Sequence, residues 1–78
     1  MNLERITLPL VGGIFDATPD FVEMASAVYP AVDIRNELIR MKEWFETHPH
    51  TKKTSAGINR FIFTWLNHAQ NREVAAHV

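Results

Sequence analysis

Apolar residues recur at helical spacing in three segments of this chain of 78 residues. The first segment begins at Thr18, whose hydroxyl can cap a helix N-terminus, and Pro19 suits the first helical turn. Pro30 disfavours helical geometry in the residue before it and therefore ends the helix. The apolar positions between these signals share one helix face and are Phe21, Met24, Ala25 and Val28.

The second segment runs from Asp33, a good N-cap, to about Thr47, and Pro49 ends it. Its apolar stripe consists of Ile34, Leu38, Met41 and Phe45, with Ile39 and Trp44 beside it. The polar residues are expected on the other, solvent side of this helix: Arg35, Glu37, Arg40, Lys42, Glu43 and Glu46.

The third segment begins with Thr54 or Ser55 as N-cap and continues to about Arg72. Its buried face is predicted to comprise Ile58, Phe61, Ile62, Trp65, Leu66 and Ala69. In a small domain most aromatic rings at helical spacing belong to the core, because each ring buries a large area. The rings assigned to the core are Phe45, Phe61 and Trp65. Phe63 departs from the stripe, and both Phe63 and Trp44 are expected to be partly exposed.

The first 17 residues make a poor helix, because Pro9 interrupts them and Gly12 and Gly13 favour a turn. We interpret this segment as an extended arm whose apolar residues lie along the helical body. A short strand around residues 6–10 is compatible with the pattern. Alone, however, the arm is too short to form a stable sheet.

The predicted fold is therefore all-α: a small three-helix bundle over residues 18–72, with the extended arm at 1–17 and a frayed tail at 73–78. The chain contains no cysteine, which excludes disulfides and thiolate chemistry. Its apolar runs are all shorter than the roughly 18 residues of a membrane span, and no signal peptide is recognisable. We expect a cytoplasmic location without membrane contact.

Patterns for catalysis and metal binding are not recognisable in this chain. It holds no nucleophile in a familiar setting, no glycine-rich phosphate loop and no zinc-ligand spacing, and its four histidines have no cysteine to accompany them. The sequence therefore predicts no enzyme, no metal site and no cofactor.

Charge divides the chain into two halves. Residues 1–34 hold five carboxylates against the single base Arg5, whereas residues 35–78 hold seven Lys and Arg against four Glu. Within the basic half, residues 48–72 contain neither Asp nor Glu. This division favours an anionic partner at the basic end, although a chance grouping of so few charges gives the same pattern.

The basic turn before the third helix is the candidate site. Lys52 and Lys53 supply ammonium groups and Thr54 a hydroxyl, near a helix N-terminus whose free N–H groups attract phosphate. Arg60 lies about one and a half turns further along the helix. Cations for phosphates beside rings for bases are typical of surfaces that bind single-stranded nucleic acid, and Phe63 is the candidate stacking ring. A solvated loop with a good cap is the alternative interpretation.

A family resemblance rests on residues 41–70, where MKEW is followed after three residues by HPHTKKTSAGINRFIFTWLNHAQ. This layout resembles the C-terminal, DnaT-like module of phage and prophage replication proteins, a small three-helix unit, over about residues 18–71. The resemblance implies binding of single-stranded DNA, contact with a helicase or its loader during primosome assembly, and a bacterial host cell. The DNA-contacting charges that it implies are Lys52, Lys53, Arg60 and Arg72. The chain departs from the family pattern at His48, where Asn is usual, and in having only two lysines in the run.

Two functions from different classes follow from these observations. The first is a single-stranded-DNA-binding accessory module of phage DNA replication. The second is a small phage-encoded protein–protein interaction module, such as an inhibitor or adaptor, a class that includes anti-CRISPR proteins. In the second case the acidic half carries the function, through Asp16, Asp20, Glu23 and Asp33.

Overall fold

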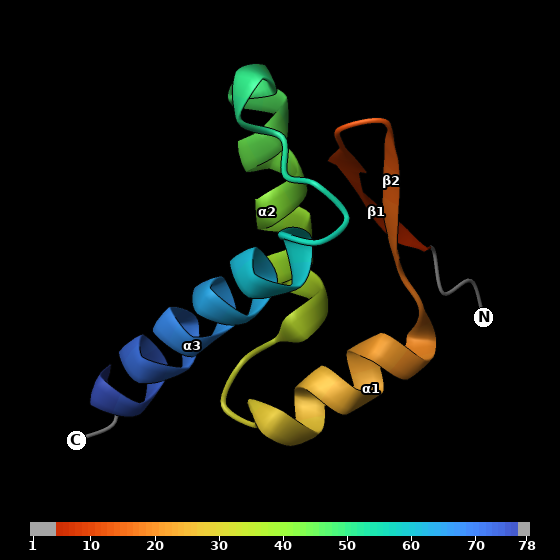
Figure 1. Cartoon of the computed structure of the whole chain (residues 1–78). Coiled ribbons are helices and arrows are strands. Elements are labelled where there is room, and N and C mark those ends of the chain that lie inside the picture. Colours follow the sequence, from red (N-terminus) through yellow and green to blue (C-terminus); the bar gives the residue numbers. More distant parts are fainter. Residues whose placement is uncertain (1–4, 77–78) are drawn as a thin grey trace.

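The computed structural model describes residues 5–76, which form a β-hairpin followed by three α-helices (Figure 1). The hairpin consists of β1 (Ile6–Leu10) and β2 (Gly13–Ala17). The helices are α1 (Pro19–Val28), α2 (Ile34–Thr47) and α3 (Ile58–Ala76), and a short 3-10 turn, η1 (Pro49–Thr51), follows α2. The central element is α2, which contacts β1, α1 and α3.

The hairpin shows that the all-α prediction is wrong, because the described residues form a small α+β fold. Its two strands are antiparallel, with Ile6 opposite Ala17 at the open end. In the turn, Gly12 has a φ of 78°, which glycine adopts without the steric cost that other residues meet. The segment interpreted as an extended arm is therefore a sheet of two strands.

The hairpin is stable because one face of β1 packs against α2. Ile6, Leu8 and Leu10 alternate along the strand and are all buried in the core. A two-stranded hairpin is marginal in water by itself but gains stability when it packs on a helix. The remaining apolar residues of the hairpin do not all lie along the helices, since Val11 is 63% exposed and Ile14 is 66% exposed.

The starts of α1 and α2 confirm the predicted caps. The Thr18 hydroxyl oxygen accepts a hydrogen bond from the Phe21 N–H, and an Asp33 carboxylate oxygen accepts one from the Asn36 N–H. The end of α2 at Thr47 also agrees with the prediction. The largest fully buried side chains come from β1, α2 and α3 and are Phe45, Leu8, Leu38, Met41, Ile62 and Leu66.

The C-terminal helix is longer than the sequence predicts. α3 continues past Arg72 to Ala76, so the first four residues of the predicted frayed tail are helical. The ends of the predicted arm and tail, residues 1–4 and 77–78, lie outside the described residues. In Figure 1, α3 runs from α2 toward the lower left, whereas the hairpin stands on the right of α2. One side of α3 and α2 therefore faces away from the hairpin.

Candidate functional site

A surface groove of about 500 Å³ lies along the first half of α3. It is lined by Lys53, Gly57, Arg60, Phe61, Thr64, Trp65 and His68. We call this the α3 groove. All seven residues belong to the described part of the chain, and they include two cations, two large rings and a histidine but no carboxylate. The structure therefore brings the predicted Lys53 and Arg60 together on one surface.

The hairpin holds the main chain of the basic turn in place. The Val11 N–H donates a 3.0 Å hydrogen bond to the Lys53 carbonyl oxygen, and Leu10 forms a parallel β-bridge with Lys53. The Lys53 ammonium nitrogen lies 5.6 Å from the centroid of the Phe61 ring, a distance that suits a cation–π contact. The correct placement of this lysine thus depends on a strand more than forty residues earlier in the sequence.

Thr54 begins the helical turn that leads into α3. Its hydroxyl oxygen accepts a 3.1 Å hydrogen bond from the Gly57 N–H, and its carbonyl oxygen accepts from the N–H groups of Gly57 and Ile58. This confirms the capping interaction predicted for Thr54, although the α-helix itself starts at Ile58. The predicted contact between Thr54 and a nucleic acid stays a prediction.

The floor of the α3 groove is aromatic. The Phe61 ring centroid lies 5.8 Å from that of Trp65 and 4.9 Å from that of Phe45. Phe45 is fully buried, as predicted, at 1% exposure. Phe61 and Trp65 were expected in the core but are only half-buried, because each has one side exposed in the groove. Trp44 is also half-buried, as predicted, and stacks on the His48 ring at 4.4 Å.

A second hollow, of about 260 Å³, adjoins the α3 groove and shares Trp65 and His68 with it. Its other lining residues are Glu37, Arg40 and Arg72. We call this the Arg72 hollow. The prediction that Glu37 lies on the solvent side of its helix is wrong, since Glu37 is only 8% exposed.

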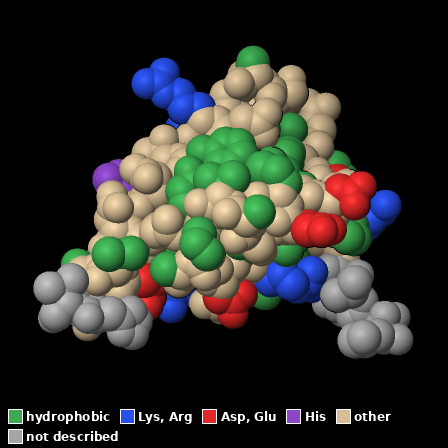
Figure 2. All heavy atoms as spheres, turned by 90° about the horizontal axis from the view of Figure 1, so that it is seen from below, with side chains coloured by type: hydrophobic (Ala, Val, Ile, Leu, Met, Phe, Trp, Pro, Cys, Tyr) green, Lys and Arg blue, Asp and Glu red, His purple; other side chains and the backbone are tan. Residues whose placement is uncertain are grey.

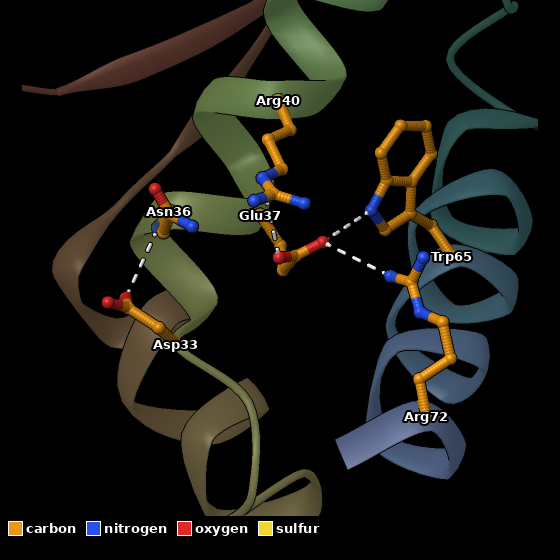
Figure 3. A network of polar contacts seen from close by, with 6 residues as sticks. All are labelled: Asp33, Asn36, Glu37, Arg40, Trp65 and Arg72. Atoms are coloured by element: carbon orange, nitrogen blue, oxygen red, sulfur yellow. Dashed lines mark hydrogen bonds and ion pairs between the residues drawn. The ribbon is translucent and has the colours of Figure 1, made fainter. Parts of the chain in front are cut away.

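Glu37 is the centre of a polar network between α2 and α3 (Figure 3). One carboxylate oxygen accepts a 2.9 Å hydrogen bond from the Trp65 indole N–H and lies 3.9 Å from the Arg72 guanidinium. The other carboxylate oxygen lies 3.9 Å from Nε of Arg40. The hydrogen bond fixes the indole that separates the groove from the hollow, whereas the two arginines are held only at the outer limit of ion pairing.

Phe63 follows Arg60 by three residues on α3 but does not line the groove that contains Lys53 and Arg60. Its ring centroid is 6.1 Å from that of Phe21 and 6.3 Å from that of Tyr29, and the Tyr29 hydroxyl donates to the Phe63 carbonyl oxygen. Phe63 is half-buried, as predicted, but it packs toward α1 and does not line the α3 groove. The α3 groove therefore does not combine this ring with Lys53 and Arg60.

The remaining predicted site residues occupy the edges of this surface. Lys52 is exposed next to Lys53 and is not among the residues that line the groove. Arg72 lines the Arg72 hollow, and together with Glu37 and Ala69 it also lines a wider depression. Sequence reasoning missed Glu37 and Arg40, because the 28 residues that separate Glu37 from Trp65 leave no local pattern.

Comparison of the chain with family models, with curated proteins and with solved structures gave no match. The resemblance to DnaT-like modules therefore stays a prediction. Within residues 5–76, no helix combines the length and the apolar character needed to cross a membrane. In the same residues, no group of three or more His, Cys, Asp or Glu side chains is arranged to hold a metal ion.

Proposed function

We propose that this chain binds single-stranded DNA through the α3 groove, as an accessory module of phage DNA replication in the cytoplasm of a bacterial host. The observation that carries the proposal is the pairing of Lys53 and Arg60 with the partly exposed rings of Phe61 and Trp65 in one groove. Surfaces that bind single strands combine cations for the backbone with rings on which bases stack.

The mechanism assigns phosphates to the rim and a base to the floor. Lys53 and Arg60 neutralise phosphates, and the Arg60 guanidinium can donate two hydrogen bonds to one phosphate group. A base stacks on the exposed side of the Trp65 indole, which its hydrogen bond to Glu37 keeps in a fixed orientation. Such stacking is tolerant of sequence, because every base offers a flat face. The lining residues include no carboxylate that would repel the backbone.

The test is the fluorescence anisotropy of a labelled single-stranded oligothymidylate titrated with the chain over a range of salt concentrations. Each phosphate contact contributes about −0.7 to the slope of log K against log salt for single strands. Lys53→Gln and Arg60→Gln should each weaken binding and reduce the magnitude of that slope by about 0.7.

The matched control is Lys42→Gln, which removes an exposed cation of α2 that lines neither the groove nor the hollow. The control should keep the wild-type slope apart from a small long-range effect. Absence of binding at low salt, or equal losses for all three variants, would refute the proposed function. An oligouridylate of the same length compares RNA with DNA, and equal affinities would show that the groove does not distinguish them.

A second candidate function is an interaction with a protein partner through α1. Figure 2 shows hydrophobic side chains gathered on the face seen from below, where α1 lies. Met24 and Val28 of this helix are exposed, as are the acids Asp20 and Glu23. Exposed apolar residues next to one sign of charge favour a basic, partly apolar partner surface, such as that of a helicase or its loader.

The two candidates can be separated with one variant. Asp20→Asn combined with Glu23→Gln removes the acids of α1 and leaves the α3 groove unchanged. The second candidate predicts weaker binding to a purified replicative helicase or helicase loader by calorimetry, with an unchanged affinity for the oligonucleotide. If the variant binds the helicase and the helicase loader as tightly as the wild-type chain does, this candidate is contradicted.

A further inference from the structure

We infer that the Arg72 hollow is a second phosphate subsite, and that the Glu37 carboxylate is the partner of Arg40 and Arg72 when no strand is bound. This inference rests on the proposed function of the α3 groove and extends it. A strand bound there would continue past Trp65 toward the C-terminal half of α3 and meet Arg40 and Arg72.

The position of the hollow is the first observation. It shares Trp65 and His68 with the α3 groove, so the two depressions lie on either side of the same indole. From Arg60 to Arg72 the axis of α3 advances by about 18 Å. That length corresponds to roughly five nucleotides at the ~3.4 Å per phosphate of a helical strand. A single strand can therefore contact both depressions at once.

The charges in the hollow are the second observation. Arg40 and Arg72 supply two guanidinium groups, whereas Glu37 supplies one carboxylate. Because both arginines lie 3.9 Å from that carboxylate, neither makes a close hydrogen bond to it. Their side chains are 60% and 67% exposed, which leaves them able to turn toward a ligand. Guanidinium groups bind phosphate with good geometry and retain their charge at any accessible pH.

The fixed indole is the third observation. The Trp65 N–H donates to the same Glu37 oxygen that faces Arg72. A phosphate that recruits Arg72 leaves this hydrogen bond in place, so the stacking surface of Trp65 is kept while the arginines change partner. Glu37 thus acts as a positioning residue for Trp65 and as an internal competitor for the two cations.

Two variants test the subsite with the same oligothymidylate titration. Arg40→Gln combined with Arg72→Gln should reduce the magnitude of the salt slope by about 1.4, two contacts at about 0.7 each. Glu37→Gln keeps an amide oxygen that can accept the Trp65 N–H but removes the competing charge. We expect it to tighten binding several-fold at low salt, and nuclear Overhauser contacts from the Trp65 indole N–H to α2 in the free variant check that the indole has not moved.

The outcomes distinguish this inference from the proposed function. If Lys53→Gln and Arg60→Gln weaken binding but the double arginine variant matches Lys42→Gln, the subsite is refuted and the groove stands. Equal or weaker binding by Glu37→Gln, with these contacts retained, refutes the competition by Glu37. If the wild-type chain binds no oligonucleotide at low salt, the proposed function fails and the subsite fails with it.

Discussion

Two sides of α3 carry aromatic residues in different chemical settings. On one side, Phe61 and Trp65 lie among Lys53, Arg60 and His68. On the other, Phe63 packs with rings of α1 and the segment after it, and α1 is acidic. All three rings of α3 are half-buried.

The comparison teaches that exposure alone does not define a stacking surface. Phe63 is half-buried, as Trp65 is, and its departure from the apolar stripe made it the candidate stacking ring. The neighbouring charges separate the two. A nucleic-acid backbone is attracted to the side with Lys53 and Arg60 and repelled by Asp20 and Glu23. The side with Phe63 is therefore better suited to packing within the protein or against another protein.

The largest expected effect is the loss of stability when the buried ring beneath the groove is removed. Phe45 is 1% exposed and its ring contacts both Trp44 and Phe61. Phe45→Ala should lower the free energy of unfolding by about 3–5 kcal/mol, because it loses buried area and leaves a cavity. Urea denaturation followed by circular dichroism measures this loss. Ile39→Ala, at an exposed position of the same helix, is the control and should cost much less. A small effect of Phe45→Ala would mean that the core is not where the structure has it.

The next prediction compares the two sides directly. Trp65→Leu should lower the affinity for oligothymidylate by about 1–3 kcal/mol, the usual contribution of one stacked base. Phe63→Leu should leave that affinity unchanged, since the ring lies outside the α3 groove. Both variants should be measured by anisotropy under conditions in which each is fully folded. If Phe63→Leu weakens binding as much as Trp65→Leu, the comparison between the two sides is wrong.

A smaller effect is expected in the hairpin that holds Lys53. Gly12→Ala forces a side chain into a left-handed conformation and should cost about 1–2 kcal/mol of stability. No atom lies within 4 Å of the added Cβ, so the cost comes from the backbone alone. Gly13→Ala is a matched control, because its Cβ also meets no neighbour and its φ is not in the left-handed range. Hydrogen exchange of the Val11 amide should accelerate in Gly12→Ala only.

The sequence predicts those parts of the fold that depend on neighbours in the chain. The caps Thr18 and Asp33 bond to N–H groups three residues later, so a short window of sequence contains the whole interaction. The hairpin was missed for the opposite reason. Its stability comes from the packing of β1 on α2, and the alternation of three buried residues is too short a signal to reveal that support.

The same distinction between local and distant contacts explains which residues of the site the sequence predicts. Lys53 and Arg60 were identified because they lie only seven residues apart, one before and one within the first turn of α3. Glu37 was placed on the solvent side because its helix position is polar, but the Trp65 indole covers it from α3. A buried carboxylate with a partner 28 residues away cannot be inferred from spacing along either helix. The Arg72 hollow therefore became visible only in three dimensions.

The smallest expected effect concerns Thr54, the predicted site residue whose hydroxyl caps the turn that leads into α3. Thr54→Ala removes the acceptor for the Gly57 N–H and should cost about 1 kcal/mol of stability. Thr54→Ser keeps the hydroxyl and should restore most of the loss, as thermal denaturation would show. The oligonucleotide affinity of the folded Thr54→Ala variant should fall by less than that of Lys53→Gln, because Thr54 does not line the α3 groove. An equal loss of affinity would make the hydroxyl a phosphate ligand as well as a cap, and would extend the groove back into the basic turn.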